Sequence, residues 1–311
     1  MIKRVLYFGS DSYIHTRKEQ LLVEFTDKEK QSASIPIEDI GVVILDAPQM
    51  TVSRAVMSKM LENNVAIIVC NEKHLPKGLM LNLESNSIQQ EHFRNQINAT
   101  EPLKKSLWQQ TIKYKIKNQA LLLQSLGITA EKLRFWFEKV KSGDPENVEG
   151  RAAAYYWQNI YSDIIEKFRR RRTGNEPNNL LNYGYAVLRA TVAREIVGSG
   201  LLPTLGIHHH NRYNAYALAD DIMEPYRPFV DWIVRDIVEK YYNDEWVDSG
   251  FNLSPPIKKE LLKIPLIDVV IEGKTHPLSI AVRHTTASLA ECFAKTKRKI
   301  AYPRFEPYSI D

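Results

Sequence analysis

Short apolar runs separated by polar residues fill the first part of the chain. This pattern is typical of β-strands, and it predicts strands over residues 4–8, 21–25, 34–37, 40–45, 65–69 and 79–83, with a turn at 75–78. Thr51 is a candidate N-cap followed by apolar residues at helical spacing, so one helix is expected before Asn63. Residues 1–85 are therefore expected to form a small β-rich domain with one helix.

The spacing of apolar residues changes after the polar stretch 84–90, which we interpret as a linker. Trp108, Ile112 and Ile116 step by four, which is typical of a helix. Further helices are predicted over residues 130–140, 145–169, 178–197, 214–224, 228–242 and 278–299, with loops at 255–256 and 273–274. The expected fold class is α+β, an N-terminal β-rich domain over residues 1–85 and a larger C-terminal all-α domain over residues 95–311.

The composition excludes several classes of protein. With 44% apolar and 10% aromatic residues, the chain can close a packed core. Its longest apolar runs, residues 41–45 and 65–70, are far below the ~18 residues that cross a bilayer, and we expect a cytoplasmic protein with no membrane partner. Cys70 and Cys292 stand apart without a C-x-x-C pattern, which argues against a disulfide scaffold or a thiolate zinc finger.

The positive charge is concentrated after residue 100. The net charge is +5, and residues 101–311 hold 31 basic against 25 acidic side chains. Such an excess fits a polyanionic partner, because Lys and Arg that neutralise phosphates release counterions. On its own, the excess is also compatible with an ordinary protein surface.

One candidate site residue lies at a predicted helix start. Residues 144–147, Asp-Pro-Glu-Asn, combine a capping residue with Pro at the first helical position. On the helix that follows, Glu149 shares a stripe with apolar residues, and Gly150 and the alanines at 152–154 leave room for a bulky ligand. The helix dipole alone also favours a glutamate in a first turn, so a purely structural role is the alternative.

A second candidate segment contains three consecutive histidines followed by two acids. Asp221 and Glu224 are three residues apart and share one face of a predicted helix. Consecutive side chains diverge, so one or two of His208, His209 and His210 at most could reach a common centre. A polar loop with solvated imidazoles is the alternative.

Glu149, one histidine and Glu224 together form a hard, oxygen-rich set of donors. Such a set suits Mg²⁺ or Mn²⁺ better than Zn²⁺, and a divalent ion of this kind serves phosphodiester chemistry. The sequence contains neither a G-x-S-x-G elbow nor a phosphate-cradling Gly-rich loop, which disfavours acyl transfer and nucleotide hydrolysis.

Clustered basic residues are candidates for contacts with DNA phosphates. Four arginines in a row end the predicted helix that carries Glu149, and a second cluster lies near the C-terminus. Basic residues at a helix C-terminus are also ordinary partners of the helix dipole. The candidate nucleic-acid-binding residues are Arg169, Arg170, Arg171, Arg172, Arg227, Lys297 and Arg298.

Three segments of the chain resemble a known family: DPENVEGRAAAYYW, NNLLNYGYAVLRA and GIHHHNRYNAYALADDIMEPYRP. They are similar to the integrase of CRISPR adaptation ("Cas one"), especially to the members found in type II systems. The resemblance covers essentially the whole chain. It implies that Glu149, His209 and Glu224 are metal ligands and that Asp221 is an accompanying catalytic acid. His209 follows from the family spacing, and His208 and His210 remain alternatives.

The resemblance also implies partners and a reaction. The N-terminal β domain would serve dimerisation and assembly, and two integrase homodimers would flank a dimer of a small ferredoxin-like adaptation subunit. The assembly would bind double-stranded DNA with 3′ overhangs and insert it as a new spacer into CRISPR repeat DNA by metal-dependent transesterification. The type II effector nuclease and accessory adaptation proteins are further partners that the resemblance allows.

Two other functions fit the same residues. A structure-selective endonuclease would use the same ion to activate water. A non-catalytic DNA-binding scaffold would merely pair the acids with Arg227 and its neighbours.

Overall fold

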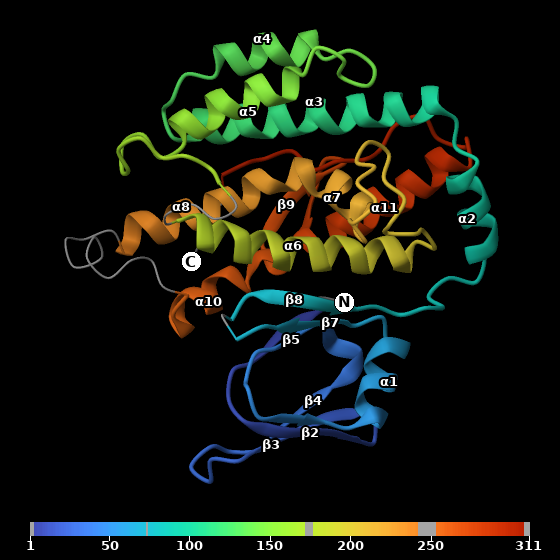
Figure 1. Ribbon diagram of the computed structural model, residues 1–311, viewed down its shortest axis with the longest axis vertical. Helices are drawn as coiled ribbons and strands as arrows, with labels where there is room; N and C mark the ends of the chain where they lie inside the picture. Colours follow the sequence, from blue (N-terminus) through green and yellow to red (C-terminus); the bar gives the residue numbers. More distant parts are fainter. Residues whose placement is uncertain (1–2, 73, 172–176, 242–252, 308–311) are drawn as a thin grey trace.

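Strands at one end of the molecule and helices over the rest define the architecture (Figure 1). The computed structural model describes residues 3–72, 74–171, 177–241 and 253–307. The strands are β1 (Arg4–Phe8), β2 (Ser12–Arg17), β3 (Gln20–Phe25), β4 (Ala33–Pro36), β5 (Ile40–Leu45), β6 (Met50–Val52), β7 (Ala66–Cys70), β8 (Pro76–Met80), β9 (Asp268–Ile271) and β10 (Lys274–Pro277).

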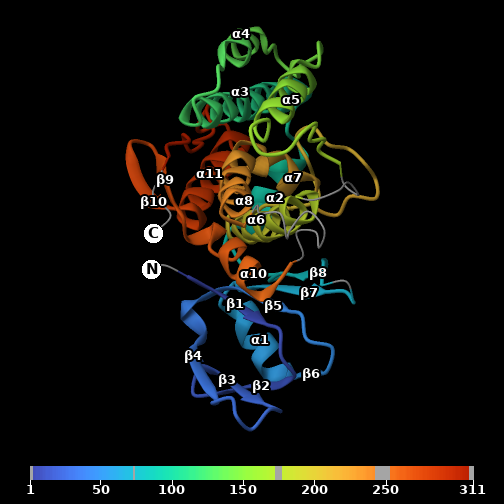
Figure 2. The ribbon, with the colours of Figure 1, turned by 90° about the vertical axis from the view of Figure 1, so that its left-hand side faces the viewer.

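The helices follow mainly after residue 88. They are α1 (Arg54–Glu62), α2 (Gln89–Ile97), α3 (Glu101–Ser125), α4 (Glu131–Lys139), α5 (Val148–Asn159), α6 (Asn178–Gly198), α7 (Ala217–Met223), α8 (Arg227–Tyr241), α10 (Pro255–Leu261) and α11 (Leu278–Phe293). Three short 3-10 turns are η1 (Ile37–Asp39), η2 (Glu224–Tyr226) and η3 (Ile264–Leu266). Both ribbon views show α3, α4 and α5 as a tier at the end opposite the sheets (Figures 1 and 2).

Two four-stranded sheets enclose a core of their own. One sheet has the order β1-β5-β7-β8 and the other β4-β3-β2-β6. Strands β2 and β3 form a hairpin whose turn residues, Lys18 and Glu19, both have positive φ, as a two-residue turn with the right twist requires. Ile14, Leu21 and Val43 are among the buried residues between the sheets and α1.

The central strand β5 of the first sheet is buried on both faces, which joins the β-rich end to the helices. On β5, Val43 packs into the core between the sheets, whereas Val42 and Ile44 pack into the helical core. Successive side chains of a strand point to opposite faces, so an uninterrupted apolar run such as 40–45 fits a strand covered on both sides. The two parts therefore share a sheet instead of meeting across a polar linker.

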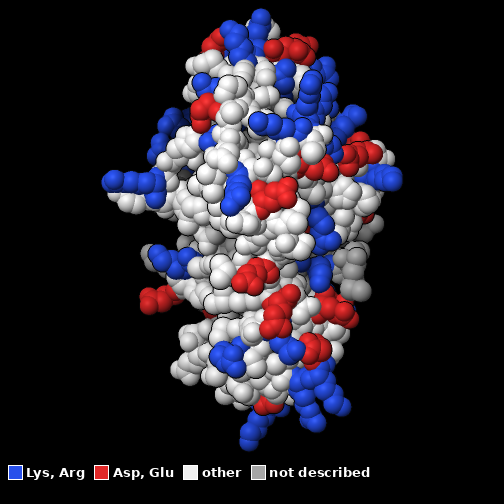
Figure 3. All heavy atoms as spheres, turned by 90° about the vertical axis from the view of Figure 1, so that its right-hand side faces the viewer, with Lys and Arg blue, Asp and Glu red and all other residues white. Residues whose placement is uncertain are grey.

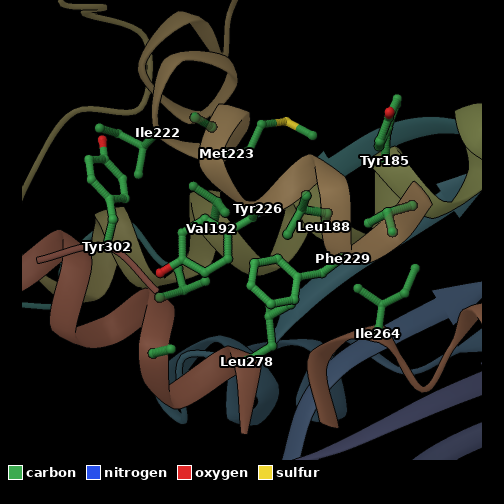
Figure 4. Close-up of a cluster of buried hydrophobic side chains, with 14 of the residues drawn as sticks. Tyr185, Leu188, Val192, Ile222, Met223, Tyr226, Phe229, Ile264, Leu278 and Tyr302 are labelled. Carbon is green, nitrogen blue, oxygen red and sulfur yellow. The ribbon is translucent and has the colours of Figure 1, made fainter. Parts of the chain in front are cut away.

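The helical core is centred on α6 and α8. Tyr226, Phe229 and Leu188 lie at its centre and Tyr302 closes one side (Figure 4). Tyr302 also shares a hydrogen bond of 2.8 Å with Thr111 of α3. The segment after α11 is therefore part of the chain's own core. Within the described residues, no helix is long and apolar enough to cross a membrane.

A buried ionic cluster ties α10 to the first sheet. The Lys258 Nζ donates to Asp46 Oδ2 at 2.7 Å and to the Tyr7 hydroxyl at 3.0 Å, and Tyr7 donates to the same carboxylate at 2.5 Å. Lys258 and Asp46 are both almost fully buried. A buried charge without its partner is strongly destabilising, so this cluster helps to hold the helices on the sheet.

The predicted α+β fold class is confirmed: the N-terminal region is β-rich and the C-terminal part is mainly helical. The helical part also contains the β9–β10 hairpin, where a loop was expected. Its turn residues, Glu272 and Gly273, both have positive φ. Strand β2 was missed because Ile14 is its one large apolar residue facing the core. Helix α2 begins inside the interval interpreted as a linker. It was missed because most of its residues are polar.

Several predicted boundaries are wrong. Ser53, and not Thr51, caps α1, because Thr51 pairs with β2 as part of β6. Strand β8 begins at Pro76, so the turn predicted at 75–78 and the strand predicted at 79–83 are both displaced. A proline is tolerated there because β8 is an edge strand, where a missing N–H can face solvent. Helix α5 ends at Asn159 and α11 at Phe293, well before the predicted ends at 169 and 299.

Replacing Lys258 by Met should lower the free energy of unfolding by about 3–5 kcal/mol, because Asp46 would stay buried without its cation. Urea unfolding followed by circular dichroism measures the change. Lys259→Met is the matched control, since Lys259 is the exposed neighbour on the same helix, and it should change stability by less than about 0.5 kcal/mol. Equal losses in the two variants would contradict the role assigned to the buried cluster.

Candidate functional site

The first turn of α5 is built by side chains that cap its free N–H groups. Asp144 accepts hydrogen bonds from the backbone N–H groups of Val148 and Glu149, both at 2.9 Å. Asn147, with φ of 48°, is the N-cap and accepts from the N–H of Gly150. The helix therefore begins at Val148, three residues later than predicted. Glu149 is held in its first turn, where the helix dipole favours an acid.

Glu149 and Glu224 converge on one cation, the ammonium group of Lys115. Lys115 Nζ lies 2.5 Å from Glu149 Oε1 and 2.6 Å from Glu224 Oε2. The three residues come from α5, η2 and α3. Burial disfavours the charged form of Lys115, but the two carboxylates outweigh it and raise its pKa. The structure thus brings together the two predicted acids, and it adds a lysine between them.

Arg227 holds the other oxygen of Glu224. Its guanidinium lies 2.9 Å from Glu224 Oε1, and Glu224 is only 6% exposed. Burial favours the neutral acid, but the positive charges of Arg227 and Lys115 outweigh it and lower the pKa of Glu224. Glu224 is therefore ionised at neutral pH. Arg227 also stacks over the ring of Tyr185 at 4.7 Å, which fixes its direction.

The histidine segment is folded around the buried carboxylate of Asp221. Asp221 Oδ2 accepts from the backbone N–H groups of Ile207 at 2.7 Å and His208 at 3.0 Å, and the N–H of His209 also points to this carboxylate. Gly206 makes the turn possible, because a Cβ there would lie 2.8 Å from Asp221 Oδ2. Asp221 is fully buried, so it anchors the segment from inside.

The three histidines have different surroundings. The ring of His208 stacks on Trp108 with centroids 4.1 Å apart, and burial lowers its pKa. His209 bonds to Asp221 through Nδ1, which raises the pKa of His209, and the charges of Glu224 and Glu149 act in the same direction. His210 is exposed. Because Nδ1 of His209 is engaged by a carboxylate, its Nε2 is the nitrogen left for a ligand, the usual arrangement of metal-binding histidines.

The predicted donors, two carboxylates and an imidazole, are of the kind that suits Mg²⁺ or Mn²⁺, but in this structure the ammonium group of Lys115 lies between the two carboxylates. Within the described residues, no three His, Cys, Asp or Glu side chains form a group that could hold a metal ion. Glu224 Oε2 has no hydrogen bond although Lys115 Nζ is 2.6 Å away, so their contact is ionic without hydrogen-bond geometry.

A basic cavity of about 860 Å³ adjoins Glu224 through Arg227. Its cationic lining comes from Arg170, Arg171, Arg189 and Arg227, and Tyr185 and Tyr213 add aromatic surface. Arg189 is paired with Asp220 at 2.6 Å. Cations beside aromatic rings are typical of surfaces that hold a nucleic-acid strand.

The predicted basic residues separate into distinct places. Arg170 binds Asn178 and Asn182 at the start of α6, so it also holds the fold together. Arg171 is exposed in the same segment. Arg169, Lys297 and Arg298 are exposed but do not line the cavity, and Arg172 lies outside the described residues. The prediction that the arginine cluster ends the helix of Glu149 is wrong, because α5 stops at Asn159.

Charged side chains of both signs cover the face of the molecule that Figure 3 shows. Lys and Arg are dense at its upper end, where α3, α4 and α5 lie in Figure 1, with Asp and Glu among them. The β-rich end of this face also carries both signs.

A family model described as CRISPR associated protein Cas1 matches residues 5–263 of the chain. The chain belongs to the Cas1 family. A relative from Neisseria meningitidis serogroup C (strain 8013), named CRISPR-associated endonuclease Cas1, is 33% identical over 310 residues, which cover 99% of this chain and 98% of the relative. The resemblance inferred from the three sequence strings is thereby confirmed.

Solved structures share the fold of this Cas1 chain. A casposase bound to integration product superposes with a TM-score of 0.79 at 21% identity, covering 100% of this chain and 96% of the casposase chain. A Cas6-RT-Cas1–Cas2 complex matches with a TM-score of 0.73 at 21% identity, covering 96% of this chain and 36% of that chain. At these identities the likeness concerns the fold.

Sequence reasoning missed two residues that contact the candidate site residues. Lys115 and Trp108 both lie on the buried face of α3. A signal for Lys115 was present, since Thr111, Lys115 and Gln119 step by four along a helix whose neighbouring positions are apolar. A lysine on such a face needs a buried acid as partner. Which acid it meets depends on the packing of α5 and η2 against α3.

Replacing Asp221 by Ala should release the backbone of residues 207–209. Hydrogen bonds to a charged acceptor are worth about 1.5–3 kcal/mol, so amide hydrogen exchange of these residues should accelerate roughly 10-fold or more. Exchange measured by mass spectrometry or NMR tests this. Asp220→Ala is the adjacent control: Asp220 binds Arg189 and Asn214 instead. If exchange at 207–209 were unchanged in Asp221→Ala, the anchoring role would be wrong.

Proposed function

We propose that this Cas1-family protein is a divalent-metal-dependent DNA integrase. It would join the 3′-hydroxyl ends of a short DNA duplex to CRISPR repeat boundaries by transesterification, and so insert new spacers during antiviral defence. In each joining step one P–O bond forms and one breaks. The hydroxyl proton leaves to solvent, and the departing 3′-oxygen of the repeat strand takes up a proton.

One observation carries this proposal beyond family membership. Glu149 and Glu224, from separate elements, converge on a single cation position, and both act electrostatically on His209. We propose that Glu149, Glu224 and Nε2 of His209 hold Mg²⁺ or Mn²⁺. When bound, the ion supplies electrophilic stabilisation of charge on the scissile phosphate.

The surrounding residues would orient these donors and the DNA. Asp221 holds the His209 ring through Nδ1, and Arg227 keeps Glu224 ionised and directed inward. Arg171 and Arg189 line the basic cavity beside Arg227 and would contact phosphates without reading bases. The cavity would thus lead a strand toward Glu224.

The partners are proposed on the same basis. A solved neighbour is a complex of Cas1 with Cas2, so we propose that this protein acts as a homodimer, with two dimers flanking a dimer of the small ferredoxin-like subunit. The DNA would be a duplex with 3′ overhangs together with the repeat. The type II effector nuclease and accessory adaptation proteins are proposed as further partners, and the cytoplasm as the location.

Two alternatives share these features. The relative named an endonuclease supports a hydrolytic outcome. The ion pairs of Glu224 with Arg227 and Lys115 are what a non-catalytic DNA-binding scaffold would show. The products formed with and without Mn²⁺ separate these functions.

Glu149→Ala should reduce covalent joining of a 3′-hydroxyl duplex to a supercoiled plasmid bearing the repeat. Loss of a direct ligand should exceed the roughly 10- to 100-fold effect of losing an outer-shell partner. The assay uses Mn²⁺ with and without the small ferredoxin-like subunit. Glu146→Ala is the matched control, because Glu146 is exposed just before the same helix and pairs with Lys141.

Each result of this assay is informative. Joining at the parental rate by Glu149→Ala would refute the assigned metal site. Metal-dependent nicking without joined duplex would indicate the endonuclease. DNA binding with no metal-dependent product in the parental protein would indicate the scaffold.

Arg171→Ala should weaken DNA binding similarly for all sequences. It should also reduce the slope of log K against log salt by about 1, as expected for the loss of one phosphate contact. Fluorescence anisotropy with a labelled duplex at several salt concentrations measures both. Arg17→Ala, an exposed arginine of β2 at the β-rich end, should leave affinity and slope unchanged. An unchanged slope for Arg171→Ala would remove Arg171 from the interface.

A further inference from the structure

Lys115 is a buried residue that the mechanism proposed above does not use. It lies near the middle of α3, with its side chain 10% exposed, between α5 and η2. Its Nζ is 2.5 Å from Glu149 Oε1 and 2.6 Å from Glu224 Oε2. No other described lysine is placed between two carboxylates at such distances.

The local charges explain why a cation must stand there. Glu149 and Glu224 are two negative groups drawn to one point, and Arg227 contacts the far oxygen of Glu224 only. Without Lys115, the two near oxygens would face each other across a partly buried space. Like charges in such a setting repel strongly unless a cation lies between them.

A divalent ion would need these same oxygens. Mg²⁺ and Mn²⁺ bind oxygen ligands directly, so an ion held by Glu149 and Glu224 would compete for the position that the ammonium now occupies. The ammonium and the ion also repel each other. Both cannot bind Glu149 Oε1 and Glu224 Oε2 together.

We infer that Lys115 is a built-in cation that holds Glu149 and Glu224 together in the metal-free protein and competes with the divalent metal for their oxygens. Lys115 is a positioning residue in this role, and it sets how tightly the site takes up the ion. The inference rests on the metal site of the proposed function. It adds that Lys115 pairs with both carboxylates when no metal is bound.

Mn²⁺ binding to DNA-free, full-length protein tests this competition without any measurement of activity. The free ion is titrated by electron paramagnetic resonance. Lys115→Met retains the length of the side chain without its charge, and it should bind Mn²⁺ at least tenfold more tightly than the parental protein. Its metal-free form should melt at a lower temperature, and Mn²⁺ should raise its melting temperature more than that of the parent.

Three further variants complete the design. Lys115→Arg keeps the charge and should retain the weaker parental affinity, whereas Lys115→Gln replaces Lys115→Met if the latter does not fold. Lys117→Met, on the same helix and stacked on the Tyr114 ring at 5.6 Å, should bind Mn²⁺ like the parent. Glu149→Ala shows whether the measured ion occupies the proposed site.

The outcomes separate the inference from the function on which it rests. If the parental protein binds Mn²⁺ through Glu149 and neither Lys115→Met nor Lys115→Gln binds it more tightly, the competition is refuted and the metal site stands. If parental binding is absent or insensitive to Glu149→Ala, and the lysine variants do not restore it, the proposed metal site and this inference both fall.

Discussion

Two carboxylates drawn to one point need a cation between them, and this requirement organises the centre of the molecule. Glu149 and Glu224 arrive on different elements, and Lys115 of α3 meets both. The contact couples the packing of α5 and η2 to the longest helix of the described chain. Any ligand that enters must satisfy the same two negative charges, so the chemistry of the site follows from the packing of its helices.

A set of buried hydrogen bonds gives this centre its shape. Asp144 caps the turn that presents Glu149, and Asp221 gathers the backbone of the histidine segment. Gln96 of α2 bonds to the backbone of Leu202 and Leu205, just before that segment. Each of these side chains satisfies backbone groups that would otherwise be left unpaired in irregular chain. These hydrogen bonds fix the path of the loops around the site.

The β-rich end packs directly on the helical core. One face of its first sheet packs on α1 and the second sheet, and the other packs on the helical core. The cluster of Tyr7, Asp46 and Lys258 adds charge-assisted hydrogen bonds across that boundary. A strand end and a helix far apart in sequence thus fix each other's position.

Local patterns were enough to predict the fold class and most helices. Apolar residues at a spacing of four indicated α3, and the continuous run 40–45 indicated a buried strand, because burial of apolar side chains follows these periods directly. Elements stabilised mainly by pairing or polar contacts escaped this reasoning. Strand β2 depends on its neighbours in the sheet, and α2 holds few apolar residues.

The sequence by itself determined which chemical groups are available: two glutamates, a run of histidines, an accompanying aspartate and an excess of basic side chains. Only the tertiary structure decided how they are used. It directed Asp221 to the backbone and to His209, separated Arg170 and Arg171 from Lys297 and Arg298, and placed Lys115 between the acids. Electrostatic partnership depends on distances of a few ångströms between residues remote along the chain, and such distances arise only when the helices pack.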